Sequence, residues 1–575
     1  MGRTQAQEPT ARHNTDMPNF NFPLSTLSIA AAVCAMSCAA TAQTAPNAGE
    51  VLRDLQQTAP QTAPRNPALQ KIDEADDSDT SNAQRVNVRS VVITGNTEVP
   101  TAELLPLVAG LEGREQSLGQ LRAAARRITR HYREKGFAVA RAFLPAQDVT
   151  DGRVTITVVE GRISSHRITN TSRLSDDRVN AFVAGVKDGD VVRGADIDRG
   201  LLLLQDTPGV GSSRATLQPG ASPGTSELLV DVAPSAPYSG SVAVDNYGSR
   251  YTGESRVSGQ FTLASPLRLG DQLGVSALTS GDGLRFARLA YQLPVGSSGL
   301  RVGYAYFDVR YKLGKEFGPL IAHGTASSHT IYASYPLIRS QLRNLNATLS
   351  YEDKKTTDNV DATATVTDKQ LGALALGVNG NLQDALGGGG INSLDLSLTS
   401  GKLEIQSAAA VAIDASSART NGSYDKFSWG LSRLQRVGDA TLLWVAFAGQ
   451  QAGKNLDSSE KFSLGGPSSI RAYPTGEASG DEGWRGTMEL RHTLGAGLHG
   501  VLFYDLGAIK VNKSPFAAVN NERHLAGAGF GVNGAWDRMQ LKANLAWRTR
   551  GGAPQSIPAS AGKSPVLSVQ AAIAF

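Results

Sequence analysis

Cysteine is absent from most of this chain. The only two, Cys34 and Cys38, lie near the N-terminus in an apolar segment that ends in a small-x-small pattern. Such a segment is typical of a secretory signal peptide, so we expect residues 1–42 to be removed by cleavage before Gln43. Cleavage there would leave no cysteine, which excludes structural disulfides, thiolate metal sites and a cysteine nucleophile. A lipoprotein carrying its lipid on Cys38 is the alternative.

Charge and long apolar runs are also scarce. Only 19% of the residues are charged and the formal net charge is +4, so the composition does not favour nucleic-acid binding. Beyond the signal segment there is no run of about 18 apolar residues, which argues against a membrane-spanning helix. The 61 glycines are instead typical of a β-rich chain with many tight turns, and 575 residues predict more than one domain.

Motifs of common enzymes are missing or incomplete. No HExxH sequence occurs, and the eight histidines are scattered along the chain. The near-match GQQAGKN at residues 449–455 lacks the spacing of a phosphate-binding loop and its Ser or Thr. The sequence therefore predicts no enzyme, no metal site and no cofactor.

Residues 43–85 are predicted to hold a short helix and a linker. In the stretch Gly49–Gln57, the side chains of Val51, Leu52 and Leu55 share one helical face. The rest of this region is rich in Pro, Ala and Asp, a composition that buries little apolar area. We expect it to be a disordered tether.

Two α+β modules are predicted next, at residues 86–162 and 163–235. In the first, Ser117 and Gln120 form a capping-box signature that opens a helix, and two strands expected over residues 137–144 and 153–161 close the module. The second repeats this order, with a helix expected over residues 195–206. Two modules of about 70 residues in one order form an internal repeat.

From residue 236 to residue 575 the chain consists of alternating segments of roughly ten residues. In the stretch 539–547, apolar residues at odd positions alternate with mostly polar residues at even positions. We count about sixteen such segments, an even number as bacterial outer-membrane barrels have. The sequence thus predicts a membrane β-barrel of about sixteen antiparallel strands, preceded by the two α+β modules, with a soluble β-sandwich as the alternative.

Short and long connections alternate along this region. The long ones lie near residues 312–322, 353–365, 401–420, 452–483, 511–522 and 549–564. Short periplasmic turns and long external loops are typical of outer-membrane barrels. Because an even number of strands returns both barrel ends to one side, the two modules are expected in the periplasm.

Several segments match one known family in order. Residues 136–163, 198–210 and 217–230 are similar to its POTRA domains, and residues 244–254 to its first barrel strand. The sequence Ile470-Arg471-Ala472-Tyr473 matches its loop motif V/I-R-G-Y/F except at Ala472, and residues 503–507 match F-x-D-x-G. The chain therefore resembles the outer-membrane transporters of two-partner secretion, the TpsB or ShlB/FhaC/HecB-type haemolysin secretion/activation proteins.

The resemblance implies a function for each part. The POTRA domains would bind a large unfolded exoprotein (TpsA-like, of adhesin or haemolysin type), and the barrel would conduct it to the cell surface. The helix with Val51, Leu52 and Leu55 would be the plug helix of the resting pore. Other implied partners are outer-membrane lipid and the barrel-assembly machinery, which would read the terminal Phe575; nucleic acid is not one. A barrel-assembly factor is the alternative function, although such proteins usually carry more than two POTRA modules.

In the family the loop motif folds back into the barrel lumen, which would make Arg471 an internal cation. Strand alternation places Phe503, Asp505 and Gly507 on the lumen face. We therefore expect Arg471 to pair with Asp505, because an arginine and a carboxylate can form two parallel hydrogen bonds.

The neighbours of Arg471 have a predicted role as well. Ile470 and Tyr473 would pack against the inner wall and keep water from the ion pair. At Ala472 the family usually has glycine. Because alanine tolerates a positive φ poorly, the expected loop geometry depends on the backbone at this residue.

Overall fold

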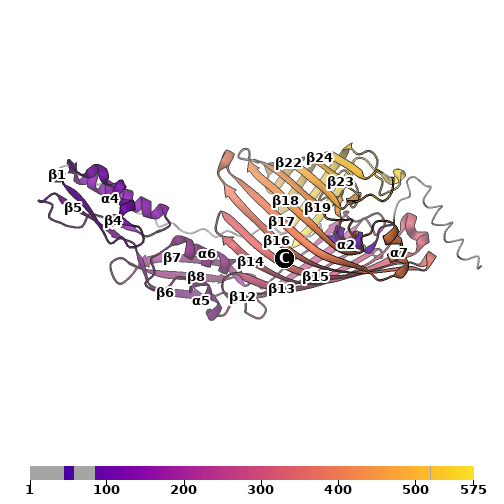
Figure 1. Cartoon of the computed structure of the whole chain (residues 1–575), viewed down its shortest axis with the longest axis horizontal. Coiled ribbons are helices and arrows are strands. Elements are labelled where there is room, and N and C mark those ends of the chain that lie inside the picture. The colour runs from indigo at the N-terminus through magenta and orange to yellow at the C-terminus, as the bar shows by residue number, and fades with distance from the viewer. Residues whose placement is uncertain (1–44, 57–84, 519) are drawn as a thin grey trace, which may run out of the picture. The chain divides into compact units, whose positions relative to one another are not determined.

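The computed structural model describes residues 45–56, 85–518 and 520–575 (Figure 1). The predicted signal peptide and most of the predicted linker lie outside these ranges. Within them, a short helix α2 (Ala48–Gln56) precedes two α+β modules and a β-barrel. None of the helices described is long and apolar enough to cross a membrane.

The first module packs helix α4 on a small sheet. Its elements are β1 (Arg85–Val88), β2 (Ser90–Thr94), α3 (Thr101–Leu104), η1 (Leu105–Leu107), η2 (Ala109–Leu111), β3 (Arg114–Ser117), α4 (Leu118–Glu134), β4 (Arg141–Phe143) and β5 (Arg153–Val159). The sheet has the order β2-β5-β4, and β1 pairs with β3 apart from it. Ile128 and Tyr132 of α4 and Ile156 of β5 are fully buried in its core.

Helix α4 begins as its sequence predicts. The Ser117 hydroxyl accepts a hydrogen bond from the Gln120 amide, and the Gln120 side chain accepts one from the Ser117 amide. This capping box satisfies two amides that the first turn leaves without partners. The strand expected over residues 137–144 is shorter, because the Phe137 amide first bonds to Tyr132 and closes the end of the helix. Only β4 is extended there.

The second module repeats the plan with its own core. It contains β6 (Arg162–Asn170), α5 (Asp176–Val183), α6 (Gly194–Gln205), β7 (Val210–Pro219) and β8 (Thr225–Pro234). The sheet order is β6-β8-β7, with β6 parallel and β7 antiparallel to β8. Helices α5 and α6 bury a separate apolar cluster against this sheet, so each module has a hydrophobic core of its own.

The rest of the chain forms a closed barrel of sixteen strands, as predicted. The strands are β9 (Tyr238–Asp245), β10 (Arg256–Ala264), β11 (Gln272–Thr279), β12 (Leu284–Val295), β13 (Leu300–Lys312), β14 (Ala322–Arg339), β15 (Arg343–Val360), β16 (Thr365–Asp384), β17 (Gly390–Ile405), β18 (Gly422–Arg436), β19 (Thr441–Ala452), β22 (Glu482–Gly495), β23 (Leu498–Lys510), β24 (Glu522–Trp536), β25 (Met539–Arg550) and β26 (Val566–Ala574). Neighbours pair antiparallel, and β26 closes on β9. Between strands lie η3 (Lys315–Leu320), η4 (Asp361–Thr363), η5 (Leu386–Gly388), α7 (Ala408–Ser416) and η6 (Ala559–Ala561).

Several strands are longer than the sequence pattern predicts. Strand β15 has 18 residues and β16 has 20, so the long connection expected at residues 353–365 is wrong. The polar residues there are satisfied within the sheet; Thr357, for example, donates a hydrogen bond to Asp368 of the neighbouring strand at 2.7 Å. Polar composition alone therefore did not mark a loop.

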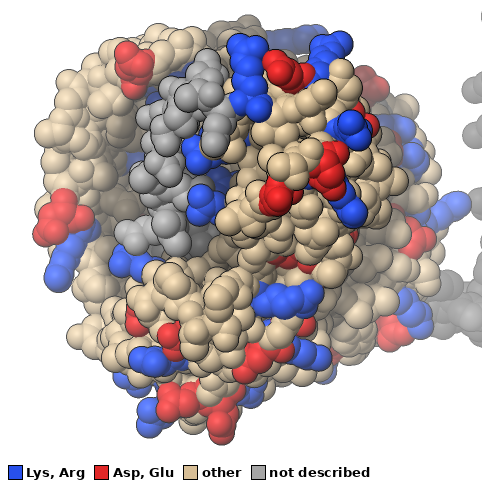
Figure 2. Space-filling view, turned by 90° about the vertical axis from the view of Figure 1, so that its left-hand side faces the viewer, with Lys and Arg blue, Asp and Glu red and all other residues tan. Residues whose placement is uncertain are grey.

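The two faces of the barrel differ in composition. Leucines such as Leu374, Leu376 and Leu398 are about half exposed on the outer surface, where lipid would cover them. On the molecular face seen in Figure 2, acidic and basic side chains are interspersed rather than gathered by sign. This distribution fits the small net charge of +4.

Candidate functional site

The connection between β19 and β22 folds back into the barrel. It contains a small hairpin, β20 (Phe462–Leu464) paired with β21 (Ala478–Gly480), with the loop motif between the two strands. Ile470, Ala472 and Tyr473 are fully buried in a cluster that includes Phe503 and Leu525 of the barrel wall. The motif thus packs on the inner surface of β23 and β24.

Arg471 meets Asp505 inside the barrel. Its Nε donates to Oδ2 of Asp505 at 2.8 Å and a terminal nitrogen donates to Oδ1 at 2.6 Å, a two-pronged contact. The Arg471 amide also donates to Oδ2, at 3.1 Å. Arg471 is 7% exposed and Asp505 0%. The same carboxylate therefore fixes both the side chain and the backbone of the loop.

Two further groups of β22 complete the arginine's surroundings. The other terminal nitrogen of Arg471 donates to Glu489 at 2.6 Å, and the Thr487 hydroxyl bridges Arg471 and Asp505. Glu489 in turn holds Arg491 at 2.6 Å. Sequence reasoning missed Thr487 and Glu489. The signal was present, because the odd-numbered residues of β22 from Arg485 to Arg491 are polar and face the lumen.

Phe503 packs against the arginine from the wall. The Arg471 guanidinium carbon lies 3.5 Å from the centroid of the Phe503 ring, which gives a cation–π contact in a water-poor place. Gly507 lies two residues after Asp505 on the same face of β23, and it leaves room for the loop. A Cβ there would lie 2.8 Å from the Trp484 carbonyl oxygen and 2.9 Å from a Leu464 methyl group.

Ala472 fits the loop without strain. Its backbone is outside the left-handed region, so the side chain carries no conformational penalty. Across from it stands Gly527 of β24, where a Cβ would lie only 2.4 Å from that of Ala472. The Tyr473 hydroxyl donates to the carbonyls of Arg550 and Gly552 at 2.7 and 3.0 Å, which ties the motif to β25.

A second group of ion pairs holds the beginning of the same loop. Glu460 lies 2.8 Å from both Lys354 of β15 and Lys426 of β18, and Asp457 lies 2.7 Å from Lys369 of β16. Lys354 has a side-chain exposure of 2%, so these charges are compensated by one another rather than by water. The loop is thus anchored on two separate parts of the wall.

Helix α2 lies in the same lumen. Val51 and Leu52 are buried and Leu55 is partly buried against an apolar cluster that includes Tyr251 and Phe307. The Ala48 amide donates to Asp358 of β15 at 2.8 Å. Figure 1 shows α2 among the barrel strands.

The helix also touches the loop itself. Ser458 donates to Asn47 at 2.6 Å, and the Arg53 side chain donates to the Ser458 carbonyl at 3.3 Å. A Cβ added at Gly49 would lie 2.5 Å from the Ser458 hydroxyl oxygen, so helix and loop approach closely.

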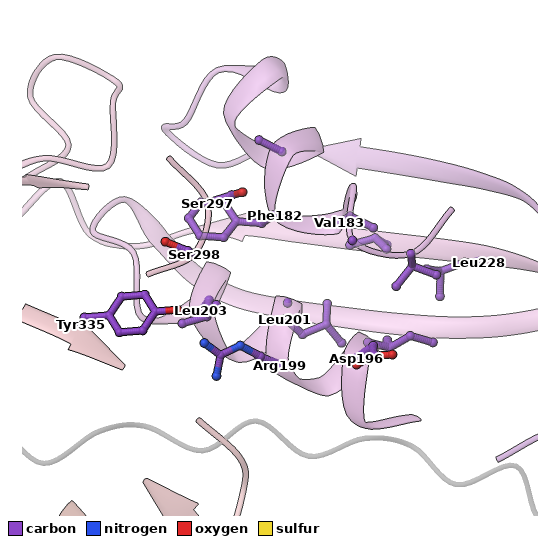
Figure 3. Close-up of a pocket in the computed structure, with 16 residues that line it drawn as sticks. Phe182, Val183, Asp196, Arg199, Leu201, Leu203, Leu228, Ser297, Ser298 and Tyr335 are labelled. Carbon is purple, nitrogen blue, oxygen red and sulfur yellow. The ribbon is translucent and has the colours of Figure 1, made fainter. Parts of the chain in front are cut away.

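The second module contacts the barrel through several arginines, among them the buried Arg339. Arg339 of β14 donates to both carboxylate oxygens of Asp206, at 2.7 and 2.9 Å. Beside this contact is a pocket of about 280 Å³ between α5, α6 and the barrel (Figure 3). Its walls include Phe182, Val183, Leu201, Leu203, Ser298 and Tyr335. None of its lining residues belongs to the loop motif.

Two further sequence features lie outside the loop site. The expectation that motifs of common enzymes are missing or incomplete is wrong at residues 220–224, which have the spacing G-x-S-x-G. These residues form the turn between β7 and β8 rather than the strand-to-helix turn of a hydrolase. The terminal Phe575 exchanges backbone hydrogen bonds with Gly240 of β9, both at 3.0 Å, and half of its surface is exposed.

A closed barrel with an inward loop and preceding α+β modules defines a class, the outer-membrane transporters with POTRA domains. Comparison with known proteins specifies the family. The family model for the haemolysin secretion/activation protein ShlB/FhaC/HecB matches residues 224–534, and the ShlB-type POTRA domain matches residues 86–161. The chain belongs to this family.

Individual relatives agree with this assignment. The heme/hemopexin transporter protein HuxB of Haemophilus influenzae is 29% identical over 457 residues, which cover 76% of this chain and 79% of HuxB. The outer membrane transporter CdiB of Dickeya dadantii is 24% identical over 418 residues, 70% of this chain and 72% of CdiB. The solved structure of CdiB from Escherichia coli has the same fold, with a TM-score of 0.70 at 22% identity, covering 89% of this chain and 94% of that one.

The protein is thus an outer-membrane transporter of two-partner secretion, with POTRA domains in the periplasm and a secreted exoprotein as its partner. The family assignment favours this function over that of a barrel-assembly factor. Both predictions made from the resemblance, the family and the transport function, are confirmed.

Proposed function

We propose that residues 86–234 receive the unfolded exoprotein and that the barrel lumen then conducts it outward, with no catalytic step by the transporter. The observation that carries this proposal is an open sheet edge. In the described part of the chain, the ten-residue strand β7 pairs with β8 alone. Such an edge can add an extended peptide as a further strand through backbone hydrogen bonds.

The lumen contents suit a channel that is closed at rest. Helix α2 and the loop with Arg471 lie inside the barrel, and they contact each other through Ser458. We infer that α2 is a plug that leaves its place during export and that the loop shifts to make room. The Arg471–Asp505 pair returns the loop to its resting position.

The remaining assignments follow the same proposal. Residues 1–42 are the signal peptide, 43–85 the plug helix and linker, 86–162 and 163–235 the POTRA domains, and 236–575 the barrel. Phe575 is read by the barrel-assembly machinery during insertion. The exoprotein is of adhesin or haemolysin type, whereas the name of the relative HuxB specifies heme/hemopexin transport.

Binding by separate parts of the protein tests this proposal. Residues 86–234 contain two complete hydrophobic cores and can be produced without the barrel. This fragment is expected to bind the N-terminal secretion region of the exoprotein encoded beside the transporter gene. The barrel alone, residues 236–575, is expected to bind it much more weakly. Equal binding by the barrel would show that the modules are spacers.

A further inference from the structure

Arg485 of β22 is a lumen-facing cation whose hydrogen bonding is incomplete. Among the residues that the structure describes, one terminal nitrogen of its guanidinium is buried and has no hydrogen-bond acceptor. The guanidinium carbon lies 6.0 Å from the ring centroid of Phe462, a residue of the inward loop. A buried donor without an acceptor is costly, so this arrangement needs an explanation.

The strand register places Arg485 close to Asp505. Arg485 stands opposite Gly507, and Thr487 stands opposite Asp505. Arg485 and Asp505 are therefore diagonal neighbours on the lumen face, a spacing of about 7–8 Å between backbones that a long side chain can bridge. Gly507 has no side chain, and in the resting position the space over it is taken by Leu464 of the loop, with a methyl group 2.9 Å from where a Cβ would lie.

The loop controls both groups. Arg471 occupies the Asp505 carboxylate, and Phe462 of the same loop lies beside Arg485. When the loop shifts, Asp505 loses its cation and Arg485 loses its aromatic neighbour in one step. A fully buried carboxylate left without a cation would strongly oppose that shift.

We propose that Arg485 is the reserve counter-ion of Asp505. It is a positioning residue that turns to the carboxylate when Arg471 leaves and yields it when the loop returns. The loop can then shift without leaving a buried charge uncompensated. This inference rests on the proposed function, in which the loop shifts during export.

The first test measures barrel stability in the full-length protein in detergent, by the temperature at which the folded band is lost on a gel. Arg485→Gln alone is expected to lower this temperature little. In the Arg471→Ala background it is expected to lower it by several degrees more, and adding Asp505→Asn should restore most of that loss. Arg485→Lys in the Arg471→Ala background should retain stability, since the cation remains.

Arg491→Gln is the matched control on the same strand, because Arg491 is paired with Glu489 rather than Asp505. Arg491→Gln is expected to change the temperature at which the folded band is lost by the same amount whether Asp505 is kept or replaced by Asn. Additive losses for Arg471→Ala and Arg485→Gln, or a loss that Asp505→Asn does not reverse, would overturn the proposal.

The second test follows export. With barrel stability near that of the wild type, Arg485→Gln should slow exoprotein export several-fold, and Arg485→Lys should restore much of the rate. Normal export by Arg485→Gln would overturn the role in loop movement. The stability test does not use cargo, so a failure of the proposed function and a failure of the reserve counter-ion are distinguishable.

Discussion

The two occupants of the lumen, the inward loop and helix α2, are held by different forces. Buried charges fix the loop near its start, through Glu460 with two lysines, and at its motif, through Arg471 with Asp505. The helix relies on one apolar face and a few hydrogen bonds, such as the one from Ala48 to Asp358. Breaking a buried ion pair costs about 3–5 kcal/mol, whereas a single hydrogen bond to a charged group, such as the one that Asp358 accepts, contributes about 1.5–3 kcal/mol.

We therefore expect the inward loop to stay in the barrel and helix α2 to be removable. The loop's contacts are directional and lose most of their stabilisation after a small shift, so the loop should return to one place. The helix slides on an apolar surface and can leave without exposing an uncompensated charge of the wall. Release of α2 should therefore precede any movement of the loop.

The largest effect is expected from the loop anchor. Arg471→Ala and Asp505→Ala should each abolish or sharply reduce export while the barrel still inserts, since each removes the two-pronged contact that holds the loop. Breaking a buried pair costs about 3–5 kcal/mol, and the cost here should lie toward or below the lower end, because water in the lumen and Arg485 compensate part of the remaining charge. Arg471→Lys should rescue poorly, because an ammonium cannot make the two-pronged contact. Export assays and heat-modified mobility on gels measure the two properties separately.

The double variant is the control for this anchor. It should be little worse than either single variant, because both remove the same contact. Fully additive defects would mean that Arg471 and Asp505 act independently and that another group holds the loop.

A smaller loss should come from crowding the motif. Gly527→Ala would place a methyl group 2.4 Å from the Ala472 methyl, an overpacking that costs about 1–3 kcal/mol. Export should fall, and Ala472→Gly in the same chain should recover part of it. Gly259→Ala is the matched control, because the nearest atom to its new methyl is 3.9 Å away. An equal export defect in both glycine variants would argue against the crowding mechanism.

Crowding at the contact between helix α2 and the loop should displace the helix. Gly49→Leu puts a side chain where a Cβ already lies 2.5 Å from the Ser458 hydroxyl and 2.7 Å from the Ser459 amide. The helix should leave the lumen more often, and planar-bilayer recordings should show a larger open fraction, as they should after deletion of residues 45–60. Gln56→Leu, at the exposed end of the same helix, is the control. An unchanged open fraction after the deletion would show that α2 does not obstruct the pore.

The smallest effect concerns acidity. Burial raises the pKa of Glu50 and Asp54 above their ordinary values of 4.5 and 3.8, against the lowering influence of Arg53. The docked helix thus binds protons more tightly than the released helix. Docking the helix with both carboxylates charged costs free energy. This cost is fully present above the raised pKa values and disappears as the carboxyls protonate, so acidification should favour docking. The open fraction should fall modestly from about pH 7 to about pH 5, and Glu50→Gln with Asp54→Asn should flatten this dependence. A rise on acidification would contradict the assignment.

The sequence predicts some residues of the site better than others. Strand alternation and the two motifs placed Arg471 and Asp505 in one lumen, and the structure brings them together at 2.6 Å. Alternation also puts Glu489 inward, but it does not say which inward acceptor the guanidinium reaches. That depends on the register of β22 against β23 and on the path of the loop, both set by long-range packing.

The strand ends show the same limit. Alternation predicted sixteen strands, because each has a lipid face and a lumen face. It did not predict how far β15 and β16 extend, since their ends are polar on both faces. The partners that keep them extended, such as Glu460 for Lys354, lie more than 100 positions away in the sequence.

The closure of the barrel has a consequence for its dynamics. Strands β15 and β16 are paired over 18 residues, whereas β26 meets β9 over five, from Gln570–Ala574 to Asp245–Ser241, followed by the Phe575–Gly240 pair. Cooperative opening begins where the fewest hydrogen bonds must break together. Amide protons on both sides of this seam should therefore exchange with solvent deuterium before those of the long central strands. The barrel thus opens locally at this seam first, even though it has no free edge.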